Sequence, residues 1–599
     1  MKARLVYAIA LVGALLALTA CGSAHGAPPS ATSPAVTPTP RPTPTPEFVS
    51  AAHFEPAACP FVLPEGIIQG ENVDCGWLVV PENRGALPSR AIRLAVGVFH
   101  PEGGATAPDP IIYLSGGPGG SALELIRYQF EEFFAPMMEG ARRDLILFDQ
   151  RGVGVSRPAL DCPDVDVLLL DLSDRVREGR PASEQETGDL VLEAYLACGE
   201  NLGRVADLAA YNSAASAADV NDLRLVLGYG RVNLWGASYG TRLALMVMRD
   251  HPEGLRSAVL DSVYPPDMDL YVETPANFSR SLNLLFDSCA ANPVCDEAYP
   301  DLRMVFFDTV ERLDAAPATR TITDTLTGQG YTTMFDGDAL VGFVFQVLYE
   351  TELKYMLPEL IYDAGQGDLE AIDRIRGALL AQRAAVSPGM MFSVQCHEEV
   401  PFSSPEAFDV ALARYPELTG LFERAAAGGL AYRVCAGWGA GQADALENQP
   451  VASDVPALAL AGEFDPVTPP AWSRHAAETL SNGYLFEYPG VGHGASAQDC
   501  GRAMMLAFLD DPTVAPDDGC IAGMGRPLSR ASSSTRWPMI VASSKNVVAG
   551  LDSGAFTMLG GNPLAAGVKD LLHRAPIYDV TPQSNEWRGL LQAEKVVRQ

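Results

Sequence analysis

The chain has 599 residues, of which 48% are hydrophobic, so it exceeds an ordinary single domain and can bury a large core. Asp and Glu number 74 against 42 Lys and Arg, which gives a formal net charge of -32. Such an acidic chain repels phosphate backbones, and the composition therefore argues against nucleic acid as a partner. The composition indicates a large globular protein and does not separate an enzyme from a binding protein.

The first 21 residues have the organisation of an export signal. Basic residues precede an apolar run (residues 5–18), which ends in Leu18-Thr19-Ala20-Cys21. Small residues directly before a cysteine resemble the lipobox of bacterial lipoproteins, where the signal is cut ahead of a cysteine that carries lipid. Cys21 is therefore the expected lipidation site and membrane attachment. A plain secretory signal and an uncleaved anchor are the alternatives, although the apolar run is short for a membrane span.

Residues 22–48 are dominated by Pro, Thr, Ser and Ala, and they include the repeat Thr37-Pro38-Thr39-Pro40. A segment with so few apolar residues cannot bury enough surface to fold. We expect it to be an extended tether between the lipid and the folded part.

Ten cysteines remain after Cys21, and an even number in an exported chain favours disulfide bonds. A metal site is the alternative, but no cysteine belongs to a C-x-x-C pair, and His397 is a lone histidine beside a cysteine. We therefore expect neither a metal nor another cofactor. Sequence does not fix the pairing, but proximity along the chain suggests Cys59 with Cys75, Cys162 with Cys198, Cys289 with Cys295, Cys396 with Cys435, and Cys500 with Cys520.

The segment Gly236-Ala237-Ser238-Tyr239-Gly240 has the pattern G-x-S-x-G. A short apolar run (231–235) precedes it and a stretch of helical composition (241–248) follows it. A serine between a strand and a helix in this pattern is held in a strained conformation that projects its hydroxyl, and the flanking positions must lack side chains. The pattern alone also fits a plain turn, but the strand, turn and helix in succession favour a nucleophile elbow.

A glycine loop (residues 115–120) follows a predicted strand (110–114) upstream of this serine. Glycines let the backbone turn close to a substrate with its N–H groups free, as an oxyanion-binding loop requires. An ordinary Gly-Pro loop is the alternative, but the position after a strand favours the oxyanion-binding loop. Beyond a further buried strand (144–149), we expect Asp149 and Arg151 to pair and to hold a loop near the site.

Strands and helices alternate up to residue 265, which predicts a largely parallel sheet. The sheet pattern resumes at 456–461 and 484–488, so the helical region between is an insertion rather than an independent domain. The prediction is an α/β-hydrolase fold with a mostly parallel sheet (49–265 and 456–520), a helical cap (266–455) after the sixth strand, and an extension (521–599) of unknown role. Within the cap, helices are expected at 276–291, 301–315, 337–349, 353–364, 369–386 and 405–414.

Ser238, Asp465 and His493 follow one another in the order nucleophile, acid, base that is typical of this fold. A serine hydroxyl needs a base to remove its proton, and the base needs an acid that fixes its tautomer. His493 lies among glycines after the last predicted strand, which favours catalysis over a structural histidine. Asp261 is the alternative acid because it also ends a strand, but the turn that contains Asp465 and its place after the cap favour Asp465.

The chain contains, in order, Gly116-Gly117-Pro118-Gly119-Gly120-Ser121, Phe148-Asp149-Gln150-Arg151-Gly152, Gly236-Ala237-Ser238-Tyr239-Gly240, Gly462-Glu463-Phe464-Asp465 and Gly492-His493-Gly494. Together, over roughly residues 54–520, these motifs resemble the proline iminopeptidase and tripeptidyl aminopeptidase family. The segments Cys59 to Pro81 and Cys500 to Cys520 look like the exported tripeptidyl aminopeptidase branch. The resemblance implies that the N–H groups of Gly117 and Tyr239 bind the oxyanion.

The chain also departs from this family, because proline iminopeptidases begin their glycine loop with histidine and this chain has Ser115. That difference counts against release of a single proline as the main activity. Exopeptidases of the family bind the α-amine of the substrate with acids of the cap, and Glu398 and Glu399 are candidates by location. The expectation is an exported serine exopeptidase acting on peptides. An esterase of the same fold and a lipoprotein that binds peptides without turnover are the alternatives.

Overall fold

The computed structural model describes residues 47–524, except for short gaps at 174–175, 178–179, 182–183, 325–327, 381–385 and 425–427. The export signal with Cys21, nearly all of the tether and the extension after residue 524 lie outside the described residues, so the expectations for them stay predictions. Within the described ranges, no helix has the length and apolar character needed to cross a membrane.

A ten-stranded sheet forms the centre of the fold, in the order β14-β13-β10-β9-β5-β6-β4-β3-β2, with β1 paired to β4. The strands from β6 to β14 run parallel, and β4, β3 and β2 add to this sheet in antiparallel fashion. The prediction of a mostly parallel sheet is confirmed. The strand bounds are β1 Phe48–Val49, β2 His53–Pro56, β3 Val73–Pro81, β4 Ser89–Phe99, β5 Ile111–Leu114, β6 Leu145–Phe148, β9 Val232–Ala237, β10 Leu255–Asp261, β13 Ala457–Gly462 and β14 Gly483–Tyr488.

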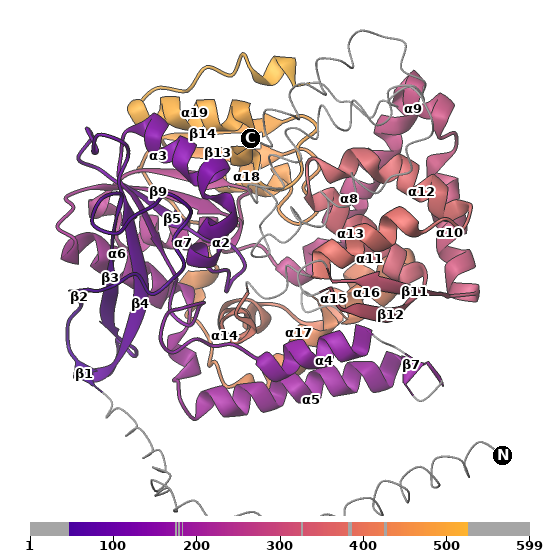
Figure 1. Ribbon diagram of the computed structural model, residues 1–599, viewed down its shortest axis with the longest axis horizontal. Helices are drawn as coiled ribbons and strands as arrows, with labels where there is room; N and C mark the ends of the chain where they lie inside the picture. The colour runs from indigo at the N-terminus through magenta and orange to yellow at the C-terminus, as the bar shows by residue number, and fades with distance from the viewer. Residues whose placement is uncertain are drawn as a thin grey trace, which may run out of the picture. The chain divides into compact units, whose positions relative to one another are not determined.

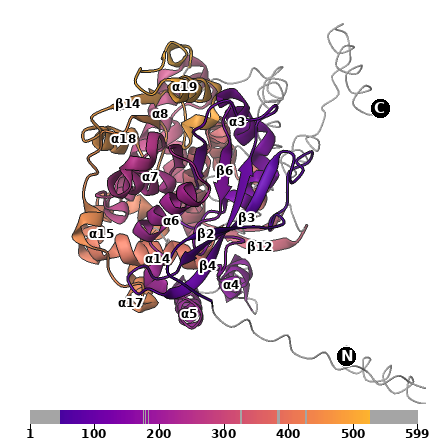
Figure 2. The same ribbon diagram turned by 90° about the vertical axis from the view of Figure 1, so that its left-hand side faces the viewer.

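Helices cover both faces of this sheet, which explains why its central strands are apolar throughout. Every residue of β5, β6 and β13 is buried, as expected for parallel strands with helices on each side. One face packs against α2 (Ala122–Gln129), α3 (Ala135–Ala141) and α19 (Asp499–Asp510). The other packs against α6 (Ser213–Val226), α7 (Tyr239–Asp250) and α18 (Pro470–Ala477), and Figure 2 shows α6 and α7 side by side.

The chain leaves the sheet after β10 and returns to it at β13, so the predicted insertion is confirmed. Figure 1 shows several of its helices, α8 and α10 to α13, grouped to the right of the sheet. The sequence did not predict helices α9, α14, α16 and α17 or a hairpin of β11 (Ala318–Thr323) and β12 (Gly330–Phe335). The helix bounds are α8 Leu270–Ala291, α9 Pro293–Ala298, α10 Leu302–Ala315, α11 Gly337–Tyr349, α12 Leu357–Gly365, α13 Glu370–Leu380, α14 Pro388–Glu398, α15 Pro405–Leu412, α16 Thr419–Arg424 and α17 Gly429–Trp438.

A second segment packs with the cap, namely helices α4 (Pro163–Ser173) and α5 (Glu184–Gly203) between β6 and α6. The sequence analysis had assigned this segment to the first part of the core. Its buried side chains belong to the hydrophobic cluster of the cap, and Tyr195 of α5 packs edge-on against Phe392 of α14 with ring centres 4.7 Å apart. Figure 1 shows α4 and α5 beneath α14 and α17. Two separate stretches of chain therefore build the cap.

The structure contains the five disulfide bonds that proximity along the chain suggested. They are Cys59–Cys75, Cys162–Cys198, Cys289–Cys295, Cys396–Cys435 and Cys500–Cys520. The pairing prediction is confirmed for all ten cysteines. Within the cap, Cys396–Cys435 joins α14 to α17, two helices that the sequence had not predicted.

Candidate active site

Ser238 lies at the turn between β9 and α7 in a conformation that non-glycine residues rarely adopt, with φ 56° and ψ -127°. The turn is possible only because its neighbours are glycines. A Cβ atom on Gly236 would overlap the carbonyl group of Gly240, and one on Gly240 would overlap the carbonyl oxygen of Leu114. The local geometry is therefore that of a nucleophile elbow, with the serine held at the end of a central strand.

The glycine loop (residues 115–120) passes directly beside this serine. A Cβ atom on Gly116 would lie 3.1 Å from the Cβ atom of Ser238. The loop is closed by a hydrogen bond of 3.1 Å from the Gly120 N–H to the Gly116 carbonyl oxygen, and Gly117 has φ +119°. Tyr239 is the first residue of α7, so its N–H has no partner within the helix. The glycine loop and the N-terminus of α7 thus meet at Ser238.

Asp465 and His493 are in direct contact, with Oδ2 of the aspartate 2.6 Å from Nδ1 of the histidine. Asp465 also accepts hydrogen bonds from the Val467 N–H at 2.9 Å, the Thr468 N–H at 2.8 Å and the Thr468 hydroxyl at 2.6 Å. Burial opposes the ionisation of Asp465, but His493 and these donors outweigh it, so the pKa of Asp465 is lowered. An ionised carboxylate at this position keeps the proton on Nδ1 and leaves Nε2 as an acceptor.

Asp261, the alternative acid, contacts the chain after the histidine and not its ring. Its carboxylate accepts the N–H groups of Ala495 and Ser496, each at 2.8 Å. The hydroxyl of the next residue, Ser262, accepts the N–H of Gly494 at 2.9 Å. Asp261 therefore helps to fix the loop that carries His493, and Asp465 is the acid in contact with the imidazole.

Ser238 and His493 do not share a hydrogen bond in this structure. Nε2 of His493 is buried and has no hydrogen-bond partner among the residues described. Tyr349, the last residue of cap helix α11, contacts both groups: its ring stacks on the imidazole at 4.2 Å, and its hydroxyl is hydrogen-bonded to Ser238. The sequence analysis predicted the helix but missed this tyrosine, because nothing in the local sequence distinguishes it.

Two family models match the chain. One, described as the alpha/beta hydrolase fold, matches residues 109–309, and one, described as TAP-like protein, matches residues 422–520. The chain has the α/β-hydrolase fold. The first match contains the glycine loop and Ser238, and the second contains Asp465 and His493.

Named relatives of this α/β hydrolase include two bacterial peptidases. The serine protease Hip1 of Mycobacterium tuberculosis is 30% identical over 228 residues, 37% of this chain and 42% of the relative. The tripeptidyl aminopeptidase of Streptomyces lividans is 29% identical over 217 residues, 36% of this chain and 39% of the relative. The chain thus covers about two fifths of the length of these relatives. A solved proline iminopeptidase of Mycobacterium smegmatis is 17% identical, covers 74% of this chain and 100% of its own, and has a TM-score of 0.34.

Glu398 and Glu399 of the hydrolase are both engaged by other protein groups. Glu398 is fully buried and accepts the hydroxyl of Ser213 at 2.6 Å, the Ser213 N–H, and Nε of Arg242 at 3.2 Å. Glu399 lies 2.7 Å from Nη1 of Arg242. Burial raises the pKa of Glu399 to about 7, although Arg242 acts in the opposite direction.

Both carboxylate oxygens of Glu398 already accept protein donors, and its role as an amine-binding acid stays a prediction. Arg242 lies one turn after Tyr239 on α7, and the Tyr239 hydroxyl is 2.7 Å from that of Ser213. The two glutamates at the end of α14 therefore attach the cap to the helix that follows the nucleophile.

Asp149 and Arg151 do not pair with each other, contrary to expectation. Arg151 forms two hydrogen bonds of 2.7 Å with Asp219 of α6, and both side chains are fully buried. Asp149 instead accepts the hydroxyl of Ser121 at 2.8 Å and two backbone N–H groups. Burial raises the pKa of Asp149 to about 6. Asp149 still supports the end of the glycine loop, so its structural role near the site holds with different partners.

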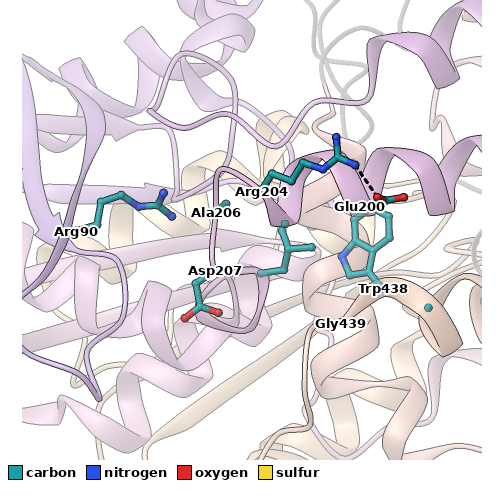
Figure 3. A pocket seen from close by; sticks show the side chains of 11 residues that line it. Arg90, Glu200, Arg204, Ala206, Asp207, Trp438 and Gly439 are labelled. Carbon is teal, nitrogen blue, oxygen red and sulfur yellow. Dashed lines mark hydrogen bonds and ion pairs between the residues drawn. The ribbon is translucent and has the colours of Figure 1, made fainter. Parts of the chain in front are cut away.

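Two other features among the described residues resemble ligand sites, and neither has the chemistry of a catalytic site. Glu47, His53 and Glu55 place one potential metal-ligating atom each within 4.8 Å of one another, but Arg93 forms ion pairs with both glutamates. A cavity of about 600 Å³, shown in Figure 3, lies between α5 and α17, and its two arginines are already paired with Glu82 and Glu200. The cavity is lined by Arg90, Gly199, Glu200, Gly203, Arg204, Ala206, Asp207, Leu208, Gly437, Trp438 and Gly439.

Proposed function

We propose that this α/β hydrolase is a serine exopeptidase that releases short N-terminal peptides, as a tripeptidyl or related aminopeptidase does, through an acyl-enzyme. The observation that carries the proposal is the Asp465–His493 pair beside a serine held in the strained elbow conformation. The named peptidase relatives support peptides as the substrate class.

In the first half of the reaction, the Oγ atom of Ser238 attacks the carbonyl carbon of the scissile peptide bond. Nε2 of His493 takes the hydroxyl proton, and Asp465 keeps the imidazole in the required tautomer and stabilises its charged form. The N–H groups of Gly117 and Tyr239 bind the negative oxygen of the tetrahedral intermediate. His493 then returns the proton to the leaving amine, which yields the acyl-enzyme and a shortened peptide.

In the second half, a water molecule attacks the acyl-enzyme. His493 again accepts a proton and returns it to the Oγ atom of Ser238, which releases the N-terminal fragment as a free acid. No step needs a metal or an organic cofactor, since the base, the acid and the backbone donors perform all proton transfers and charge stabilisation.

Replacing Ser238 by alanine tests the nucleophile. We expect turnover to fall by several orders of magnitude while the melting temperature stays within a few degrees, because only one oxygen atom is lost. A fluorophosphonate probe should label the wild type at Ser238 and leave the variant unlabelled. Near-normal turnover in S238A would refute the assignment, and failure to label the wild type would favour a peptide-binding protein without turnover.

The peptidase and esterase alternatives differ in substrate, because the same residues cleave both kinds of bond. A tripeptide amide with a free α-amine, its N-acetylated form and a small acyl ester form the decisive set. We expect turnover of the free-amine peptide and at least a tenfold loss on acetylation. Turnover of the ester alone would establish the esterase instead.

We also propose that the protein is exported and attached to the bacterial membrane by lipid on Cys21. The five disulfide bonds support an oxidising compartment, since such bonds are rare in reducing ones. Cys21→Ala should move the protein from the membrane fraction to the soluble fraction, and the wild type should carry a lipid mass on its first residue. A wild type with no lipid mass would contradict the anchor.

A further inference from the structure

A short segment after cap helix α11 contacts the loop that carries His493, which we term the histidine loop (residues 489–494). The His493 N–H donates to the carbonyl oxygen of Tyr349 at 2.9 Å. The Gly492 N–H donates to the hydroxyl of Thr351 at 2.9 Å, and the Tyr355 hydroxyl donates to the carbonyl oxygen of Gly490 at 3.1 Å. Three hydrogen bonds thus fix the backbone of the histidine loop to the cap.

Tyr349 extends this contact to the reacting side chains themselves. Its ring lies over the imidazole of His493 with centres 4.2 Å apart and planes 23° apart, which is a stacked arrangement. Both residues are buried. A flat ring at this distance restricts the imidazole to one plane.

The hydroxyl of Tyr349 is hydrogen-bonded to Ser238. Burial raises the pKa of Tyr349 well above its usual range, so the phenol keeps its proton. Each of these two hydroxyl groups can both donate and accept a hydrogen bond. In the proposed reaction, the proton of Ser238 passes to Nε2 of His493. This nitrogen is buried and has no hydrogen-bond partner among the described residues.

We propose that Tyr349 is a positioning residue that the cap supplies to the pair Ser238 and His493. Its ring orients the imidazole, and its hydroxyl holds the Oγ atom of Ser238 through their hydrogen bond. This inference rests on the proposed function, because it assigns Tyr349 a role in the same reaction. It implies that the core alone does not complete the site.

Two substitutions separate the roles of the hydroxyl and the ring. Tyr349→Phe removes only the hydroxyl, and we expect kcat to fall about tenfold with KM unchanged, since one positioned hydrogen bond is lost. Tyr349→Leu removes the ring as well, and we expect kcat to fall about a hundredfold or more. The ratio of kcat between the Tyr349→Phe and Tyr349→Leu variants would then measure the contribution of the ring.

Tyr432→Phe is the matched control, because Tyr432 is also a cap tyrosine whose hydroxyl is hydrogen-bonded to a serine, Ser403, at 2.7 Å. We expect its kcat to stay within about twofold of the wild type. The rate of labelling by a fluorophosphonate supplies a measurement that does not depend on peptide binding. It should fall in both Tyr349 variants and stay unchanged in the control.

Wild-type kcat and labelling rates in both Tyr349 variants would overturn the inference. A loss confined to KM would also overturn it, because it would make Tyr349 a substrate contact. If the leucine variant does not fold, the phenylalanine variant decides alone. Ser238→Ala, assayed in parallel, separates the two proposals: its activity would defeat the proposed function, whereas an inactive S238A beside unimpaired Tyr349 variants would defeat only the role of Tyr349.

Discussion

The core and the cap contribute to the candidate site through different kinds of contact. In the core, Ser238, Asp465 and His493 each follow a parallel strand, so the register of the sheet brings their loops to one edge. The cap contributes hydrogen bonds and ion pairs that hold those loops from outside. The core thus provides the proposed reacting groups, and the cap restricts how they can move.

Each of the four segments that form the site has its own contact with the cap. The glycine loop accepts the N–H of Ser387 at the Gly119 carbonyl oxygen, at 2.9 Å. Arg280 of α8 donates to the carbonyl oxygen of Asp465 at 2.6 Å. Helix α7 is paired with α14 through Arg242, and the histidine loop is bonded to the segment after α11. A cap held at four places is a part of the active-site scaffold, in addition to any role in admitting substrate.

In the core, we expect Asp465→Asn to cause the largest loss of activity. Without the carboxylate, the histidine loses the charge that fixes its tautomer, and kcat should fall about ten-thousandfold in a steady-state assay. Asp261→Asn is the control, because Asp261 binds the backbone after His493 and not its ring. We expect D261N to lose no more than about tenfold in kcat. The opposite ranking would make Asp261 the functional acid.

On the cap side, Arg242→Met should cost stability more than chemistry. It leaves Glu398 and Glu399 buried without their common partner, and breaking a buried ion pair in this way costs about 3–5 kcal/mol. Thermal unfolding followed by circular dichroism should show a clearly lowered Tm. An unchanged Tm would mean that the two glutamates do not hold the cap to α7.

Glu399→Gln changes the partner of Arg242, and we expect it to have a smaller effect than Arg242→Met. Because the pKa of Glu399 is raised to about 7, a large share of this carboxyl is already protonated at neutral pH, and glutamine resembles that form. We expect a change of about 1 kcal/mol or less in stability and no change in KM for peptides with a free amine. A tenfold rise in KM for those peptides alone would restore the amine-binding role that the sequence suggested for Glu399.

The difference between core and cap also explains what the sequence could predict. The strands of the core are short apolar runs, and the glycines around Ser238 and His493 are local requirements of the turns that carry them. Local signals of this kind are visible in one sequence. They were sufficient to predict the parallel sheet, the insertion and the Asp465–His493 contact, all of which the structure contains.

The cap contacts could not be predicted in this way, because each joins residues far apart in the chain. Tyr349 ends an ordinary helix, and only the folded chain brings its ring to His493. The same holds for Arg151, whose partner is Asp219 and not the nearby Asp149. Glu398 looked available for a substrate because its partner Arg242 belongs to a distant helix. Charged residues near a predicted site therefore need their partners identified before a function is assigned.

The smallest expected effect concerns Lys354, which carries a buried positive charge in the cap segment beside the histidine loop. Its ammonium group donates to the Thr351 carbonyl oxygen at 3.2 Å and lies over the rings of Tyr355 and Phe464. Among the residues that the structure describes, no carboxylate forms an ion pair with it. Burial lowers the pKa of Lys354 to about 7, although Glu352 and Glu463 act in the opposite direction.

The sign of the pH effect follows from this lowered pKa. Below about pH 7 the lysine is charged in both the folded and the unfolded chain, so the folded state bears the full cost of the buried charge. Between pH 7 and 10.5 the folded chain releases this proton and the unfolded chain keeps it, so the contribution of Lys354 to stability improves as the pH rises. Lys354→Met removes the charge at every pH. We expect it to raise Tm by roughly 2–4 °C at pH 6 and by less at pH 9, whereas an equal shift at both values would show that the lysine keeps its proton in the fold.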